Sequence, residues 1–140
     1  MAIQYSVSLR NAQLDAIETV IGTAPLLRIY SGSIPSLPAT AASGTLLCTI
    51  TLPSDWLGAA GSGTKSLSGT WSGTGAAAAS TGTNAGYFRI LDSGAAATHI
   101  QGTITATAGG GDMTLNNISI ADGQAVSVST FAVSAANATS

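Results

Sequence analysis

Charged side chains are scarce in this sequence. Only 7% of the 140 residues are Asp, Glu, Lys or Arg, against roughly 25% in an ordinary soluble domain. The four cations, at Arg10, Arg28, Lys65 and Arg89, are scattered along the chain. A protein that binds nucleic acid needs clustered Lys and Arg to displace the counterions of the phosphate backbone. The composition therefore argues against direct binding to DNA or RNA.

Residue types that carry out chemistry are also few, with one histidine, one cysteine and six carboxylates in the chain. Zinc needs about three or four closely placed Cys, His or carboxylate ligands, and calcium needs several oxygen ligands. Neither pattern is present. His99, Asp112 and a serine could form a hydrolytic triad, but no G-x-S-x-G motif supports one. We therefore expect no enzyme, no metal and no cofactor, and a hydrolase that uses His99 is kept only as an alternative to test.

Long apolar runs and export signals are missing as well. No apolar stretch approaches the roughly 20 residues of a membrane span. The N-terminus has no basic segment followed by an apolar one, as a signal peptide would. Cys48 is alone, so it forms no intramolecular disulfide, and its position in an apolar pattern favours a small buried side chain. We expect a protein that is made and folded in a reducing cytoplasm and has no contact with a membrane.

What the sequence does have is the alternation typical of β-strands. The best-specified stretch is 86–120. It holds an aromatic and β-branched strand at 87–91, a turn at 92–94 and an alternating strand at 99–106. Three glycines at 109–111 then form a turn before a strand that starts at Met113. Successive strands that are joined by tight connections predict an antiparallel β domain.

Further elements are predicted on both sides of this stretch. A short helical turn follows Ser54 as N-cap, and Trp56 fills the core. In the last strand the apolar parity changes between Val128 and Phe131, which predicts a bulge or burial on both faces. The loop 31–44 is long enough to be a binding element, and the low-complexity loop 73–84 has no side chain able to anchor it. The remaining strands are predicted at 26–30, 45–52, 65–72 and 125–135, with a weak one at 3–6.

One helix is predicted, at residues 7–21. Val7, Leu14, Ile17 and Ile21 fall on one side of it, and Gly22 ends it. Arg10 falls among these apolar positions and would extend its charge to solvent or to a partner. The helix either covers an open face or end of the β domain or docks on another subunit, and both interpretations remain open.

These elements predict a mainly all-β fold: a two-sheet β-sandwich, preferably a jelly roll, with one N-terminal α-helix. An immunoglobulin-like sandwich is the main rival. We expect a single β-sandwich domain over 1–140. It would consist of an N-terminal segment and helix at 1–22, the sandwich at 26–135 and a frayed tail at 136–140.

The sequence as a whole resembles a family of virus proteins. The series YSVSLRNAQLDAIETVIGT, LLRIYSG, TLPSDWL, GYFRILDS, HIQGT, GGGDMTL and ISIADGQAVSV is similar to the jelly-roll cementing, or decoration, proteins of tailed-bacteriophage capsids. The resemblance implies a structural virion protein that binds the outer surface of an icosahedral head and cements neighbouring capsomers. It also implies the phage major capsid protein as partner, and a homo-oligomer, with a dimer favoured over a trimer.

A different class of function remains as the alternative, a receptor- or glycan-binding module of a phage tail or fibre, which would need exposed aromatic residues.

More than half of the residues are Ala, Gly, Ser or Thr. A surface with so few ions loses little desolvation energy when it is covered. A covered surface and a merely hydroxyl-coated β domain fit this composition about equally. For the capsid or partner contact the sequence suggests large or charged residues outside the core pattern: Ile3, Tyr5, Arg10, Ile34 and Leu37.

Overall fold

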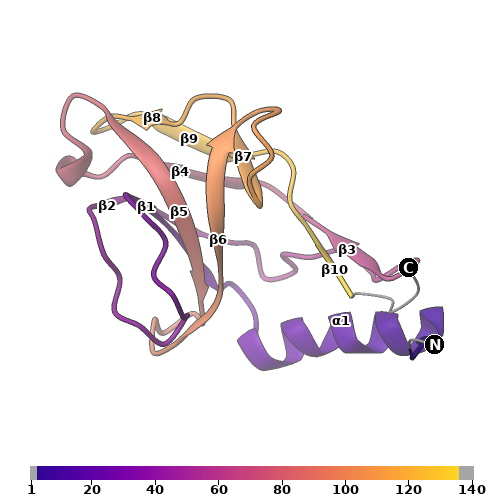
Figure 1. The fold of residues 1–140 in the computed structure, drawn as a ribbon. Helices are drawn as coiled ribbons and strands as arrows, with labels where there is room; N and C mark the ends of the chain where they lie inside the picture. The colour runs from indigo at the N-terminus through magenta and orange to yellow at the C-terminus, as the bar shows by residue number, and fades with distance from the viewer. Residues whose placement is uncertain (1–2, 136–140) are drawn as a thin grey trace.

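A long antiparallel hairpin, β5 (Thr83–Leu91) and β6 (Thr98–Ala106), forms the centre of the fold. The computed structural model of the protein describes residues 3–135. The hairpin belongs to a sheet with the strand order β2-β1-β5-β6-β7, which curls into a half-barrel (Figure 1). The other members are β1 (Leu26–Ser31), β2 (Leu46–Thr51), β7 (Met113–Leu115) and β8 (Ser119–Ile120), which pairs with the start of β5.

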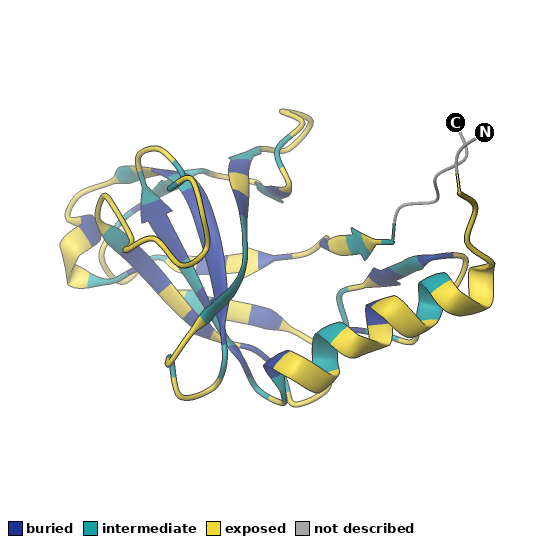
Figure 2. Cartoon of the chain, turned by 60° about the horizontal axis from the view of Figure 1, so that its bottom comes forward, coloured by how far each residue is buried: buried dark blue, intermediate teal, exposed yellow. Residues whose placement is uncertain are grey.

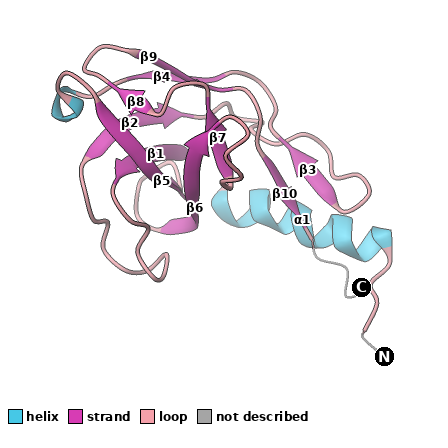
Figure 3. Cartoon of the chain, turned by 45° about the horizontal axis from the view of Figure 1, so that its top comes forward, coloured by secondary structure: helices cyan, strands magenta, loops and turns pink. Residues whose placement is uncertain are grey.

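Two short ladders complete the β structure. β4 (Trp71–Thr74) pairs with β9 (Ala125–Val128), and β3 (Thr64–Ser66) pairs with β10 (Ala132–Ser134), both antiparallel. An isolated bridge between Cys48 and Gly75 connects the β4 side to β2 and so extends the half-barrel. The β3–β10 ladder lies beside the helix α1 (Val7–Ile21), away from the curled sheet (Figure 3). A single 3₁₀ turn, η1 (Ala77–Ala79), precedes β5.

The expectation of a mainly β fold with one N-terminal α-helix is confirmed. The helix has the predicted bounds, because local signals fix both ends. The side chain of Ser6 accepts a hydrogen bond from the backbone N–H of Leu9 at 3.2 Å, as an N-cap does. Gly22 ends the helix with a φ of 87°, which glycine adopts without steric strain.

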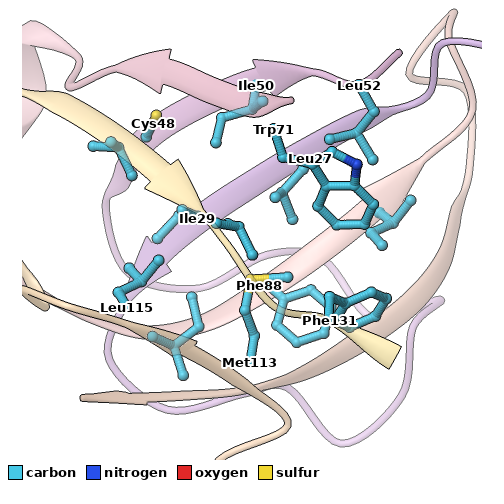
Figure 4. Close-up of a cluster of buried hydrophobic side chains, with 14 of the residues drawn as sticks. Leu27, Ile29, Cys48, Ile50, Leu52, Trp71, Phe88, Met113, Leu115 and Phe131 are labelled. Atoms are coloured by element: carbon cyan, nitrogen blue, oxygen red, sulfur yellow. The ribbon is translucent and has the colours of Figure 1, made fainter. Parts of the chain in front are cut away.

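The core fills the inside of the curled sheet. Phe88 of β5 makes an edge-on contact with Phe131, which in turn lies against Trp71 of β4 (Figure 4). Trp56 is fully buried, as predicted, and its indole N–H donates to the carbonyl of Gly22 at the end of the helix. Burying four large aromatic side chains in contact gives a hydrophobic gain of several kcal/mol, and the ring geometry adds to it.

Two predicted strands are each divided in the structure. The predicted strand 65–72 is interrupted at Gly69, whose φ of 72° does not fit a strand, and it becomes β3 and β4. The predicted strand 125–135 becomes β9 and β10, which pair with β4 and β3 in turn. The parity change between Val128 and Phe131 therefore marks the point where the chain leaves one ladder for the other. Neither the predicted bulge nor the predicted burial on both faces is found.

The purely antiparallel arrangement is also wrong at one edge. β7 runs parallel to β6, with Ile104 opposite Met113. The glycine-rich turn makes this possible, because Gly110 adopts a φ of 83° and the Gly111 N–H donates to the Thr105 hydroxyl. The chain thus turns back twice within a few residues.

Three smaller predictions are corrected. Residues 3–6 form no strand, and the residues after Ser54 form a bend rather than a helical turn. The segment 73–84 is anchored after all, because Ala79 is completely buried and its carbonyl accepts a hydrogen bond from the Thr83 hydroxyl. Small residues are what this region requires: a Cβ on Gly75 would lie 1.9 Å from the carbonyl oxygen of Ala121. The predicted frayed tail, 136–140, lies outside the described residues.

Candidate interaction surface

The helix α1 and the β3–β10 ladder together form an extension of the half-barrel, which we call the arm (residues 3–21, 64–66 and 132–134). Figure 2 shows the helix with a few buried positions and a largely exposed outer side. Only Leu14 and Ile21 of the helix are buried, and Ile17 packs partly against the core. The helix therefore covers one end of the β domain with a narrow stripe and leaves most of its circumference open.

Polar contacts hold the helix on the ladder. Lys65 of β3 is 3% exposed, and its Nζ lies 2.9 Å from Asp15 Oδ1 and 2.5 Å from Glu18 Oε2. Burial lowers the pKa of Lys65, but hydrogen bonds and charge from Glu18 and Asp15 outweigh it and leave the pKa raised. Asn11 Oδ1 accepts from the Gly63 N–H at 2.9 Å. The ammonium group thus stays charged and fixes the helix to the ladder.

Arg10 takes part in the same attachment. Its Nε donates to the carbonyl of Ala135 at 3.0 Å, and its guanidinium occupies the place that a side chain on Gly63 would need. The sequence allowed Arg10 to reach solvent or a partner. In the structure at least one of its donors is engaged within the chain.

The exposed large apolar side chains gather on the arm. Residues 3–135 hold six of them, of which five belong to the N-terminal segment and helix, namely Ile3, Tyr5, Val7, Leu9 and Val20, and the sixth is Leu37. Val7 was expected on the buried side of the helix but is 51% exposed. Leu9 and Val20 are eleven residues apart, close to three helical turns, and so share one side of the helix.

Beside Val20 a groove of about 300 Å³ runs between the helix and β6. Its lining is mainly apolar and includes Ile17, Ile21 and Ile100, with Gln13 and His99 as polar members. Leu9 and Val20 share one side of the helix and the groove adjoins Val20, and we call these three features together the apolar face of the arm. Apolar surface gathered in this way marks contact sites on soluble proteins.

The structure divides the five residues suggested by the sequence into two groups. Ile3, Tyr5 and Arg10 belong to the arm, whereas Ile34 and Leu37 lie in the loop between β1 and β2, away from the N-terminal end of the helix in Figure 1. Leu37 is 61% exposed, and Ile34 is half-buried. Leu9 and Val20 were not predicted as contact residues, although large apolar residues outside the apolar stripe of a helix can indicate a contact site.

His99 and Asp112, which the sequence offered for a hydrolytic triad, have different partners in the structure. His99 Nε2 lies 3.6 Å from Asp92 Oδ2, not beside Asp112, whose carboxylate accepts hydrogen bonds from the backbone N–H and the hydroxyl of Thr103. Cys48 is completely buried, and burial raises the pKa of its thiol. Within residues 3–135, no group of three or more His, Cys, Asp or Glu side chains lies close enough together to hold a metal ion.

Comparison of the chain with protein-family models, curated proteins and solved structures finds no match. In the part of the chain that the structure covers, no helix has the length and hydrophobicity to cross a bilayer. The resemblance to capsid cementing proteins therefore depends on the sequence pattern alone.

Proposed function

We propose that this protein is a structural interaction protein, specifically one that binds the outer surface of an icosahedral phage head and cements neighbouring capsomers. The observation that carries the proposal is the apolar face of the arm. Leu9 and Val20 are 47% and 66% exposed on one side of a helix that internal polar contacts hold in place. A fixed apolar face is ready for contact, because little conformational entropy is lost when it is covered.

The distribution of aromatic residues supports this proposal over a glycan-binding module. Sugar rings stack on exposed aromatic faces, but Trp56, Trp71 and Tyr87 are each at most 1% exposed, and Tyr30 is 7% exposed. Of the tyrosines and tryptophans in residues 3–135, Tyr5 is the one that is exposed. A single tyrosine is a poor platform for sugar recognition.

The proposal includes the finer points that the resemblance implies. These are a jelly-roll topology for the β domain, a homo-oligomer with a dimer favoured over a trimer, and the major capsid protein as partner. A protein that binds only the closed, expanded shell stabilises that state by mass action. An oligomer that touches two capsomers gains from effective concentration, so that modest contacts by each copy suffice.

The first test compares complete heads with heads stripped of this protein. We expect stripped heads to lose DNA at lower temperature and lower chelator concentration, and added protein to restore resistance. Equal resistance of stripped and complete heads would show that the protein does not cement the shell. Copy number provides a second check, because a head protein is present in hundreds of copies per particle and a tail-tip module in only a few.

The second test locates the contact. The double exchange Leu9→Ser with Val20→Ser should abolish sedimentation with expanded heads while leaving the melting temperature nearly unchanged, because both side chains are largely exposed. Thr81→Ala, in the exposed turn beside η1, is the matched control and should bind normally. The exchange Ile34→Ser with Leu37→Ser tests the loop instead. Binding that survives the first exchange but not the second would place the contact on the loop and refute the role of the arm.

A further inference from the structure

A second surface feature lies on the outer face of the main sheet, under the loop between β1 and β2 (residues 32–44). Hydrogen bonds from β5 and β6 hold the loop in place. The Tyr87 hydroxyl donates to the Ser43 carbonyl at 2.6 Å and accepts from the Ser43 N–H at 3.0 Å, and Gln101 Nε2 donates to the Pro35 carbonyl at 2.7 Å. These bonds fix the loop above β5 and β6, on the side of the sheet opposite to the core.

Between this loop and the β5–β6 turn there is a pocket of about 370 Å³. Residues 38–41 and 95–98 form its walls, and Arg89 and Leu91 of β5 complete the lining. Five of the eight wall residues are alanines. The pocket therefore combines alanine-rich walls, which also carry polar groups, with the side chain of one arginine.

Within residues 3–135, Arg89 has no anionic partner. The residue is 4% exposed, and both its Nε and its Nη2 are buried without a hydrogen-bond partner. Its recorded contact is with the face of the Tyr87 ring, 6.0 Å from Cζ to the ring centre. No ion pair within residues 3–135 involves Arg89. A buried guanidinium with free donors is expensive, because desolvation is not compensated by an opposite charge.

The neighbours of Arg89 add further buried polar atoms that have no hydrogen-bond partner. Arg28 of β1 is directly opposite Arg89, and its Nε is likewise buried without a partner. Gln101 of β6, opposite Arg89 on the other side, has an unpartnered buried Oε1. Like charges facing each other across strands destabilise a sheet unless an anion lies between or beside them. Three adjacent residues on one face thus carry unsatisfied polar atoms, and two of them are cations.

We propose that this pocket binds a carboxylate carried on a short aliphatic stem. A guanidinium presents two parallel N–H donors that match the two oxygens of a carboxylate, and charge assistance makes such pairs strong. The alanine methyl groups of the walls offer apolar contact to a short methylene stem. Such a ligand has two sources, a free short-chain carboxylic acid and a glutamate side chain of a protein. The pocket belongs to the curled sheet rather than to the arm, so this proposal is independent of the proposed function.

The test titrates the whole protein with sodium butyrate, with 1-butanol as the uncharged probe of equal length, and follows the melting temperature. Butyrate should raise the melting temperature progressively, since a ligand that binds only the folded state stabilises it, whereas butanol should not. Arg89→Met, which keeps the stem and removes the donors, should weaken butyrate binding by about tenfold or more. Arg10→Met removes the same charge from the arm and should leave butyrate binding unchanged. An equal response of the wild type and the Arg89 variant would overturn the proposal.

A spectroscopic measurement on the wild type covers the case in which the variant does not fold. The Nε–H resonance of Arg89 should shift on addition of butyrate and not of butanol, and an unchanged resonance at saturating butyrate would refute binding. The peptides acetyl-Ala-Glu-Ala-amide and acetyl-Ala-Gln-Ala-amide separate the two sources. Tighter binding of the glutamate peptide than of butyrate assigns the pocket to a protein side chain, and the reverse order assigns it to a free acid. A glutamine peptide that binds as well as the glutamate peptide contradicts carboxylate recognition.

Discussion

The attachment of the helix to β3 leads to an asymmetric prediction. Removing the two acids, by Asp15→Asn with Glu18→Gln, should destabilise the protein more than removing the cation that they share, by Lys65→Met. The reason is burial: the Lys65 side chain is 4% exposed, whereas those of Asp15 and Glu18 are 62% and 26% exposed. Without the acids a buried ammonium group remains, but without the ammonium group the acids can be hydrated where they are.

The magnitudes follow from the same exposures. An exposed ion pair contributes about 0–1 kcal/mol, and loss of the partner of a fully buried charge costs about 3–5 kcal/mol. Since both acids are partly exposed, we expect the double exchange to cost about 2–3 kcal/mol. Met at position 65 keeps the apolar stem in the same space and should cost about 1 kcal/mol or less. With roughly 3 °C of melting temperature per kcal/mol, the double exchange should lower it by about 6–9 °C.

Urea unfolding followed by circular dichroism measures both effects. Asp55→Asn, at an exposed carboxylate outside the arm, is the control and should change the stability little. The pH dependence provides a second readout. Because the pKa of Lys65 is raised in the folded state, its contribution is complete below the ordinary value of 10.5 and is lost as pH rises through the folded value. A Lys65→Met variant that is less stable than the double acid variant would refute the reasoning.

Three further outcomes are expected. Gly86→Ala should cost about 2 kcal/mol or more in urea unfolding, because a Cβ there would lie 2.0 Å from the carbonyl oxygen of Gly32 and the backbone would have to move; an unchanged midpoint would contradict this. Cys48 should react with a thiol reagent only as fast as the protein unfolds, because burial raises the pKa of its thiol and blocks access; fast labelling of the native protein would be the opposing result. The pKa of Asp92 is lowered chiefly by its hydrogen bond from the Ala96 N–H, so its contribution to stability is complete above its ordinary value of 3.8 and is lost as pH falls through the folded value. In acid titration the Asp92→Asn variant should lack this part of the pH dependence.

Elements set by local signals could be predicted from the sequence. The helix has a serine N-cap and a glycine stop, and its bounds are as predicted. The strands from Leu26 and Thr98 alternate clearly or are rich in β-branched residues, and they too are found near the predicted places. These signals act over a few residues, so a single sequence is sufficient to show them.

Features set by distant pairing could not be predicted in the same way. The parity change before Phe131 was noticed in the sequence, whereas the interruption at Gly69 was not, and their common cause could not be read from either. β3 and β4 separate, and β10 and β9 separate with them, because each pair forms its own ladder. Likewise, the pairing of Arg28 with Arg89 depends on a strand register that joins residues far apart in the chain. No local pattern specifies such a register.

The positions of the few charged side chains also distinguish the two proposed contact surfaces. Lys65 is paired with two acids, Arg10 donates to Ala135, and Arg28 and Arg89 have buried donors on the outer face of the sheet. The cations therefore contribute little to the apolar face of the arm. Salt screens interactions between charges but does not weaken apolar contacts in the same way. Binding to heads through Leu9 and Val20 should accordingly persist as ionic strength rises, whereas binding of a carboxylate at Arg89 should weaken. A salt titration of both activities on one preparation would thus distinguish the two contacts without any substitution, and equal salt dependence of the two would contradict an apolar contact at the arm.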